Sequence, residues 1–119
     1  MELKTQILNG IIIAELDTKQ TIINEVQDAV DLLGNASYLN ATKVIIHESN
    51  LHPDFFNLKT GIAGEILQKF TNYRMQLAII GDYSKYSSKS LKDFIFESNK
   101  HGRIMFLSSR EEAYTRLMQ

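Results

Sequence analysis

NLKTGIAGEILQKF, residues Asn57–Phe70, reads as a loop that leads into a helix. Its apolar residues recur at helical spacing as far as Tyr73, which predicts one continuous apolar face. Thr60 suits the N-cap position, because its hydroxyl can accept a free backbone N–H of the first turn. Gly61 and Gly64 are unusual there, since a glycine inside a helix costs about 1 kcal/mol relative to alanine. The two glycines predict that a strand, a ligand or a partner approaches this backbone closely.

The composition limits the classes of protein to consider. The chain has 119 residues, of which 44% are hydrophobic, and this is typical of one globular domain. Its net charge of −1 argues against a nucleic-acid binder that neutralises phosphates with a basic face. The absence of cysteine fits a reducing cytoplasm. No segment resembles a signal peptide or approaches the roughly 20 apolar residues of a membrane span, so we expect a cytoplasmic protein.

The N-terminal part predicts a β-hairpin. Asn9-Gly10 separates two β-rich runs, Thr5–Leu8 and Ile11–Leu16, and this dipeptide favours a type I′ turn with positive φ at both positions. The start of the second run, Ile11-Ile12-Ile13-Ala14, is apolar on both faces. We therefore expect the second strand to be central in a sheet.

Strands and helices then alternate. Buried strands are expected at residues 43–47, 76–81 and 103–107. Helices are expected to start near Asn24 with Gln27, at the central stretch, at Ser90 with Asp93, and at Ser109 with Glu112. The first of these ends at Gly34 or continues to about Leu39. The order predicts a single α/β domain over residues 1–119, with a mixed, mostly parallel five-stranded sheet and about four helices.

Polar side chains follow several of the predicted parallel strands, at the edge where ligands bind in open α/β sheets. The start of the central helix is expected at the same edge, where its free N–H groups and Lys59 would suit an anion. The predicted binding residues are Lys59, Thr60, Gly61, Gly64, Tyr83, Ser84, Lys85, Tyr86 and Ser87. A secondary set is His47, Glu48 and Asp82, and Ser108, Ser109 and Arg110 reach the same edge. The alternative is that these residues only cap helices and solvate loops.

The sequence predicts neither a metal nor a cofactor. His47, Glu48 and His52 do not have the spacing of a helical His-Glu-x-x-His zinc site. No Gly-x-Gly-x-x-Gly follows the first strand, and Tyr86 with Lys89 is not the Tyr-x-x-x-Lys pair of reductases. Glu65 and Glu97 lie on predicted helices. Because a lone glutamate on a helix is usually exposed to solvent, we expect these two to be exposed and not catalytic.

Three segments resemble the bacterial domain of unknown function 4180 family. They are Asp31-Leu32-Leu33-Gly34-Asn35-Ala36, residues 56–65, and residues 81–91. The likeness covers nearly the whole chain. It implies no established activity.

A more distant resemblance is to STAS domains of the anti-sigma-factor antagonist type. Ala14-Glu15-Leu16-Asp17 is similar to the Gly-Glu-Leu-Asp strand end of that family, and Thr60-Gly61-Ile62-Ala63 to the Ser-Gly-Leu-Gly that opens its switch helix. The STAS motif reads Asp-Ser-Ser-Gly, and a partner kinase phosphorylates its first serine. Lys59 stands at that serine here, so a fixed positive charge replaces the switched negative one and Thr60 is the remaining acceptor.

These patterns support three hypotheses. The first is a regulatory, non-enzymatic STAS-like module that binds a partner protein or a small anionic ligand through Lys59, Thr60, Gly61 and residues 83–89. The second is a small hydrolase or transferase with His47 as general base, oriented by Glu48 or Asp82. The third is a homodimer that pairs through an exposed helix face or the first strand, which carries little charge to protect a sheet edge.

Overall fold

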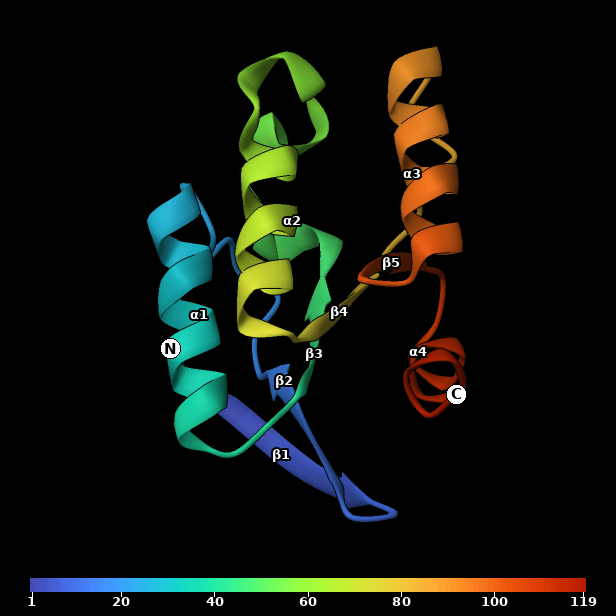
Figure 1. The fold of residues 1–119 in the computed structure, drawn as a ribbon. Helices are drawn as coiled ribbons and strands as arrows, with labels where there is room; N and C mark the ends of the chain where they lie inside the picture. Colours follow the sequence, from blue (N-terminus) through green and yellow to red (C-terminus); the bar gives the residue numbers. More distant parts are fainter.

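The computed structural model describes all 119 residues and contains one five-stranded sheet (Figure 1). The strand order is β1-β2-β3-β4-β5, with β1 antiparallel to β2 and the other strands parallel. The strands are β1 (Leu3–Leu8), β2 (Ile11–Leu16), β3 (Lys43–His47), β4 (Gln76–Ile80) and β5 (Ile104–Leu107). Asn9 and Gly10 have φ values of 51° and 79°, which confirms the predicted hairpin.

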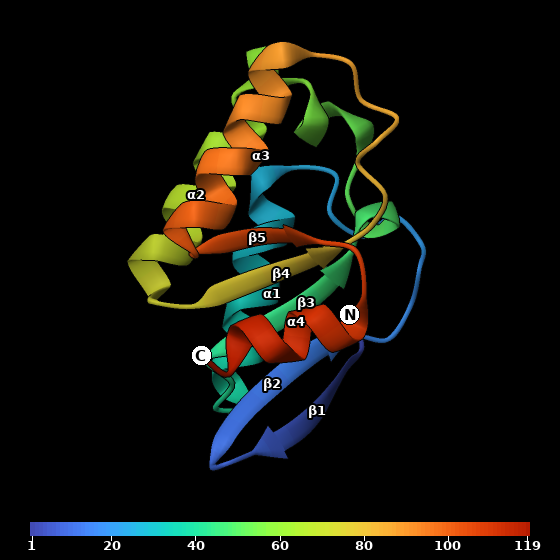
Figure 2. The same ribbon diagram turned by 90° about the vertical axis from the view of Figure 1, so that its right-hand side faces the viewer.

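Three helices cover one face of the sheet and a fourth covers the other (Figure 2). They are α1 (Val26–Tyr38), α2 (Ile62–Tyr73), α3 (Lys89–His101) and α4 (Arg110–Leu117). Strands β2 to β5 follow one another in space as in sequence, so three right-handed crossovers place α1, α2 and α3 on the same face. The fourth helix comes after β5 and packs against the opposite face.

Alternating side chains of the sheet divide the core into two unequal parts. On the larger side, Val44 and Leu77 pack with helix residues such as Leu32 and Ile66. On the smaller side, β-strand residues pack against Ala113 and Leu117 of α4. The sheet is therefore buried on both faces where α4 crosses it, as the continuous apolar strands predict.

The central stretch folds into a 3₁₀ turn, Leu58–Thr60, followed by α2. Gly61 stands between them with φ of +78°, a conformation that favours glycine, so it and not Thr60 is the N-cap. Thr60 Oγ1 still accepts the Ile62 N–H at 3.3 Å. A Cβ added at Gly61 or Gly64 would meet nothing within 4 Å, so no segment of this chain makes the predicted close approach. Tyr73 lies outside the apolar face and is 44% exposed.

The first helix differs from its predicted start. It begins at Val26, and the Asp28 carboxylate accepts the backbone N–H groups of Asn24 and Glu25, instead of the predicted box that begins at Asn24. The helix passes through Gly34 and ends at Tyr38, the later of the two predicted ends.

The later helices begin close to their predicted positions. The N-cap of α3 is Ser88, two residues before the predicted Ser90. Gly102 ends α3 with φ of +90°. Ser109 caps α4 by accepting the Glu112 N–H at 3.1 Å. The Glu112 carboxylate accepts the backbone N–H of Ser108, whereas in a regular capping box it would accept the N–H of Ser109 itself.

Candidate functional site

The two predicted binding segments lie at the same end of the sheet, beyond the carboxyl ends of β3 and β4 (Figure 2). Phe56, in the turn just before Lys59, connects them. Its ring stacks on Tyr86 with centroids 4.9 Å apart and lies 6.3 Å from the ring of Tyr83. Aromatic pairs in this arrangement contribute about 0.5–1.5 kcal/mol beyond their buried area. The two loops therefore form one structured rim, which we call the carboxyl rim (residues 48–61 and 81–88).

Tyr83 belongs to the core of this rim and is not free to stack on a ligand. Its hydroxyl donates to the Ile79 carbonyl at 2.5 Å, and its ring meets Phe106 edge-on at 5.5 Å. Burial raises the pKa of the Tyr83 phenol, and the nearby charge of Glu48 raises this pKa further.

Glu48 is the polar centre of the carboxyl rim. Its carboxylate accepts the Tyr86 hydroxyl at 2.5 Å and the Asp82 N–H at 3.2 Å, and it pairs with the Lys85 ammonium at 2.7 Å. Burial, followed by the hydrogen bond to Glu48, raises the pKa of Tyr86. The adjacent Gly81 leaves room for this carboxylate, because a Cβ there would lie 2.6 Å from Glu48. The structure thus brings Glu48, Asp82, Lys85 and Tyr86 together in one place.

A hollow of about 440 Å³ opens beside Glu48. Its lining is partly apolar and partly polar, as in many small binding sites. The lining residues are Thr21, Glu48, Ser49, Leu51, Pro53, Phe56, Lys85 and Tyr86. Only Lys85 and Tyr86 of the primary predicted set contribute to it.

The other predicted residues are exposed outside the hollow, either on the carboxyl rim or, for Gly64, in the first turn of α2. They are Lys59, Thr60, Gly61, Gly64, Ser84 and Ser87. The Thr60 hydroxyl is already engaged, since it donates to the Asp54 carbonyl at 2.8 Å with the Asn57 carbonyl 2.9 Å away. Ser84 donates to the Asp82 carboxylate at 2.6 Å, and this hydrogen bond lowers the pKa of Asp82.

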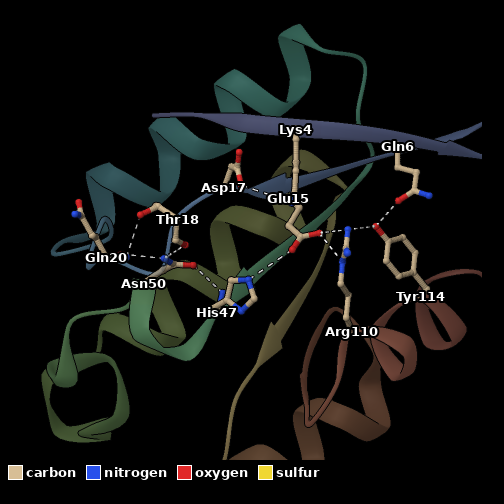
Figure 3. Close-up of polar contacts among 10 residues, drawn as sticks. All are labelled: Lys4, Gln6, Glu15, Asp17, Thr18, Gln20, His47, Asn50, Arg110 and Tyr114. Atoms are coloured by element: carbon tan, nitrogen blue, oxygen red, sulfur yellow. Dashed lines mark hydrogen bonds and ion pairs between the residues drawn. The ribbon is translucent and has the colours of Figure 1, made fainter.

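His47 belongs to a second cluster, on the α4 side of the sheet (Figure 3). Its Nε2 lies 3.5 Å from Oε2 of Glu15, which is only 5% exposed. Arg110 places Nε and Nη2 both at 3.0 Å from the other Glu15 oxygen, and the charge of Glu15 raises the pKa of this guanidinium. Glu15, and neither Glu48 nor Asp82, is therefore the acidic partner of His47.

This second cluster continues to the edge strand. The Tyr114 hydroxyl donates to Gln6 Oε1 at 2.8 Å and lies 3.4 Å from Arg110 (Figure 3). A hollow of about 280 Å³ adjoins His47, and its lining residues are Lys4, Glu15, Leu16, Asp17, Thr18, Lys19 and His47. Glu15 could have been found from the sequence, because it is a charged residue within the apolar run of β2. A charge in such a position is expected to be buried and therefore to need a partner.

Asn50 fixes the backbone between the two clusters. It is fully buried, and its Oδ1 accepts the His47 N–H at 2.7 Å. Its Nδ2 donates to the carbonyls of Thr18 and Gln20 at 2.9 and 2.8 Å (Figure 3). This one amide therefore ties the end of β3 to the loop after β2, a role that the sequence did not reveal.

A family model for a domain of unknown function, DUF4180, matches residues 8–117. The chain belongs to the DUF4180 family. The matched region of this DUF4180 protein includes the whole carboxyl rim together with Glu15, His47 and Arg110. The chain matches no curated protein and no solved structure. No cluster of three or more His, Asp or Glu side chains could hold a metal ion, and none of the helices is long and apolar enough to span a membrane.

Proposed function

We propose that this DUF4180 protein is a cytoplasmic, STAS-like regulatory module that acts by binding at its carboxyl rim and not by catalysis. The observation that carries the proposal is the locking of the two rim loops by the Phe56–Tyr86 stack and by the contacts of Glu48 with Tyr86 and Lys85. A surface held in one conformation loses little entropy when a partner binds. The rim is therefore suited to docking a folded partner protein.

A free lysine and an open helix turn favour a partner that presents an acidic group at this point of the rim. Lys59 is exposed and forms no ion pair within the chain, and it lies next to the first turn of α2. Gly64 in that turn is exposed and has no neighbour within 4 Å of an added Cβ. A partner can therefore approach the α2 backbone closely while Lys59 attracts it electrostatically. A small anionic ligand held by the same residues is the other candidate occupant.

Affinity capture followed by quantitative binding tests this proposal. Lys59→Glu reverses the free charge, and Gly64→Arg places a long side chain on the open turn without a clash in the fold. We expect each variant to weaken binding of the recovered partner about tenfold or more, as expected for residues central to an interface. Lys100→Glu makes the same charge change on an exposed lysine at the other end of the sheet and should bind normally. Equal affinity of all three variants would refute the assignment.

The His47–Glu15 pair favours a second candidate function, a hydrolase or transferase. A histidine beside a carboxylate in an open hollow has the geometry of an oriented general base. Turnover of generic activated esters and phosphoesters, compared between wild type and His47→Gln, tests this candidate. A rate that falls with the substitution supports an enzyme, and a rate that His47→Gln leaves unchanged removes it.

A homodimer is the third arrangement to test. Strand β1 has no neighbour on its outer side, and Ile7 on it is 66% exposed. Edge strands with exposed apolar residues are prone to pair with other chains. Size-exclusion chromatography with light scattering should show a dimer that Ile7→Lys returns to monomer, and a monomer at every concentration would contradict it.

A further inference from the structure

The edge opposite the carboxyl rim carries a concentration of positive charge. A hollow of about 250 Å³ lies at the amino ends of the parallel strands, and no acidic residue lines it. Its lining residues are Thr42, Lys43, Arg74, Gln76, His101, Gly102 and Arg103. In a chain of net charge −1, this hollow gathers Lys43, Arg74, Arg103 and the imidazole of His101 in one place. We call this hollow the basic pocket.

The topology of the sheet assembles the basic pocket. Thr42 and Lys43 lie at the start of β3, Arg74 lies in the turn between α2 and β4, and Gly102 and Arg103 link α3 to β5. Because β3, β4 and β5 are parallel neighbours, the three segments that enter them meet side by side. Figure 2 shows the starts of β4 and β5 beside the ends of α2 and α3.

None of the permanent cations is neutralised within the chain. No carboxylate lies within ion-pair distance of Lys43, Arg74 or Arg103. Burial lowers the pKa of Lys43, and the charge of Arg103 lowers this pKa further. The two cations therefore repel each other, and a bound anion would relieve that repulsion.

Hydrogen-bond donors in the basic pocket are only partly used. The Lys43 ammonium donates to Gln76 Oε1, and Gln76 Nε2 donates to the Gly102 carbonyl at 3.0 Å. Arg103 donates one Nη1 hydrogen to the Met75 carbonyl at 3.1 Å, and its buried Nε has no acceptor. Buried donors without acceptors are rare in folded proteins, so the Arg103 guanidinium keeps unused hydrogen-bonding capacity beside the hollow.

The helix ends alone do not account for these residues. Arg74 and His101 lie at the C-terminal ends of α2 and α3, where basic residues are favoured by the helix dipole. Each helix end contributes only about half a negative charge, so two ends offset about one of the three permanent cations. Lys43 is the first residue of β3, and Arg103 stands between the C-cap of α3 and the start of β5. About two positive charges therefore remain for a ligand.

We propose that the basic pocket binds a small phosphate-bearing molecule. Guanidinium groups recognise phosphate oxygens with paired N–H groups, and the Lys43 ammonium adds a compact charge. The volume of the pocket suits a phosphate or diphosphate group with a small organic part. The proposal does not depend on the carboxyl rim, which lies at the other end of the strands.

Titration of the full chain with inorganic pyrophosphate at constant ionic strength tests the proposal by backbone amide NMR. We expect saturable shifts at residues 42–43, 74–76 and 101–103, with the amides of the carboxyl rim unmoved. Lys43→Gln removes one charge, and Arg74→Asn removes another while keeping a residue that tolerates the left-handed φ of +58°. Each should weaken binding about tenfold, as expected on loss of a charge-assisted hydrogen bond.

Three comparisons make the result decisive. Arg74→Lys keeps the charge and should bind more tightly than Arg74→Asn. Lys92→Gln removes an exposed lysine outside the pocket and should bind as wild type. Unchanged amide spectra away from the pocket confirm that each variant is folded. Shifts spread over the whole surface, a lack of saturation at millimolar pyrophosphate, or equal affinity of the folded variants would overturn the proposal.

Discussion

Glu48 and Gly81 are in direct contact: a Cβ added to Gly81 would lie 2.6 Å from both Cβ and Oε1 of Glu48. Because Cβ of Glu48 is involved, rotation of the Glu48 side chain alone cannot relieve the clash. Gly81→Ala should therefore displace the backbone at the end of β3 and weaken the bonds of Glu48 to Tyr86 and Lys85. We expect the free energy of unfolding to fall by about 1–3 kcal/mol, the usual cost of overpacking, as measured by urea denaturation.

Gly64→Ala is the matched control for this prediction. Gly64 is in a helix with nothing within 4 Å of an added Cβ, so the substitution should stabilise the protein by up to about 1 kcal/mol. If Gly81→Ala were as stable as wild type, the close packing of Glu48 against β4 would be wrong. If Gly64→Ala also loses partner binding, glycine at position 64 is needed for the partner to approach the first turn of α2.

Asn50 should be among the least tolerant polar residues of the chain. Asn50→Ala removes three hydrogen bonds to backbone groups of His47, Thr18 and Gln20. Each buried group left without a partner costs about 1–3 kcal/mol, so we expect a total loss of roughly 3 kcal/mol or more. Urea denaturation measures the loss, with Asn35→Ala on an exposed helical site as a near-neutral control. If Asn50→Ala lowered the free energy of unfolding no more than an ordinary surface substitution does, Asn50 would not anchor the backbone of these segments.

The fold was largely readable from the sequence because local signals agreed with the global arrangement. Asn9-Gly10 specifies its turn by positive φ, and continuous apolar runs mark the buried parallel strands. The helix ends were less certain, because Ser88 and Ser90 both suit an N-cap and only packing selects between them. Gly61 was correctly singled out, but its reason is a left-handed φ and not a close neighbour.

The polar clusters were only partly predictable, because their contacts join residues far apart in the chain. The link between Glu48 and Tyr86 spans 38 positions, and its approximate place followed from the rule for strand ends. The contact of Arg110 with Glu15 spans 95 positions and depends on α4 folding back over the opposite face of the sheet. No local pattern gives that direction, so His47 was assigned the wrong acidic neighbours.

Breaking the Glu15–Arg110 contact should destabilise the protein by a moderate amount. Arg110→Ala leaves the buried Glu15 carboxylate without the guanidinium that contacts its Oε1 through Nε and Nη2. Loss of one member of a fully buried pair costs about 3–5 kcal/mol, but the Arg110 side chain is 48% exposed, so we expect about 1–2 kcal/mol. A double-mutant cycle with Glu15→Gln measures the coupling between the two residues.

Lys4→Ala serves as the control for that cycle. Lys4 pairs with Asp17, and the two side chains are 52% and 54% exposed. Loss of this exposed ion pair should change the free energy of unfolding by less than about 1 kcal/mol. If the changes in unfolding free energy caused by Glu15→Gln and Arg110→Ala were additive in the double mutant, the two side chains would not interact in solution.

Alkaline pH should destabilise the protein through the two tyrosines of the carboxyl rim. Burial raises the pKa of both Tyr83 and Tyr86 above the ordinary value of 10.0, and the negative charge of Glu48 raises both further. Above pH 10 the folded protein therefore keeps protons that the unfolded chain has lost. Stability from this source is complete below about pH 10 and falls as the pH rises toward the folded pKa values.

Urea denaturation at a series of pH values, combined with tyrosine absorbance, measures this effect. We expect the free energy of unfolding to decrease above pH 10, and two of the five tyrosines to ionise only as the protein unfolds. Tyr86→Phe should make the decrease shallower, because one of the two protonated phenols is gone, and it should cost about 1–3 kcal/mol at neutral pH by removing the hydrogen bond to Glu48. Tyr38→Phe, at an exposed site, should leave the pH dependence unchanged. Ionisation of all five tyrosines near pH 10 in the folded protein would show that the rim is open to water.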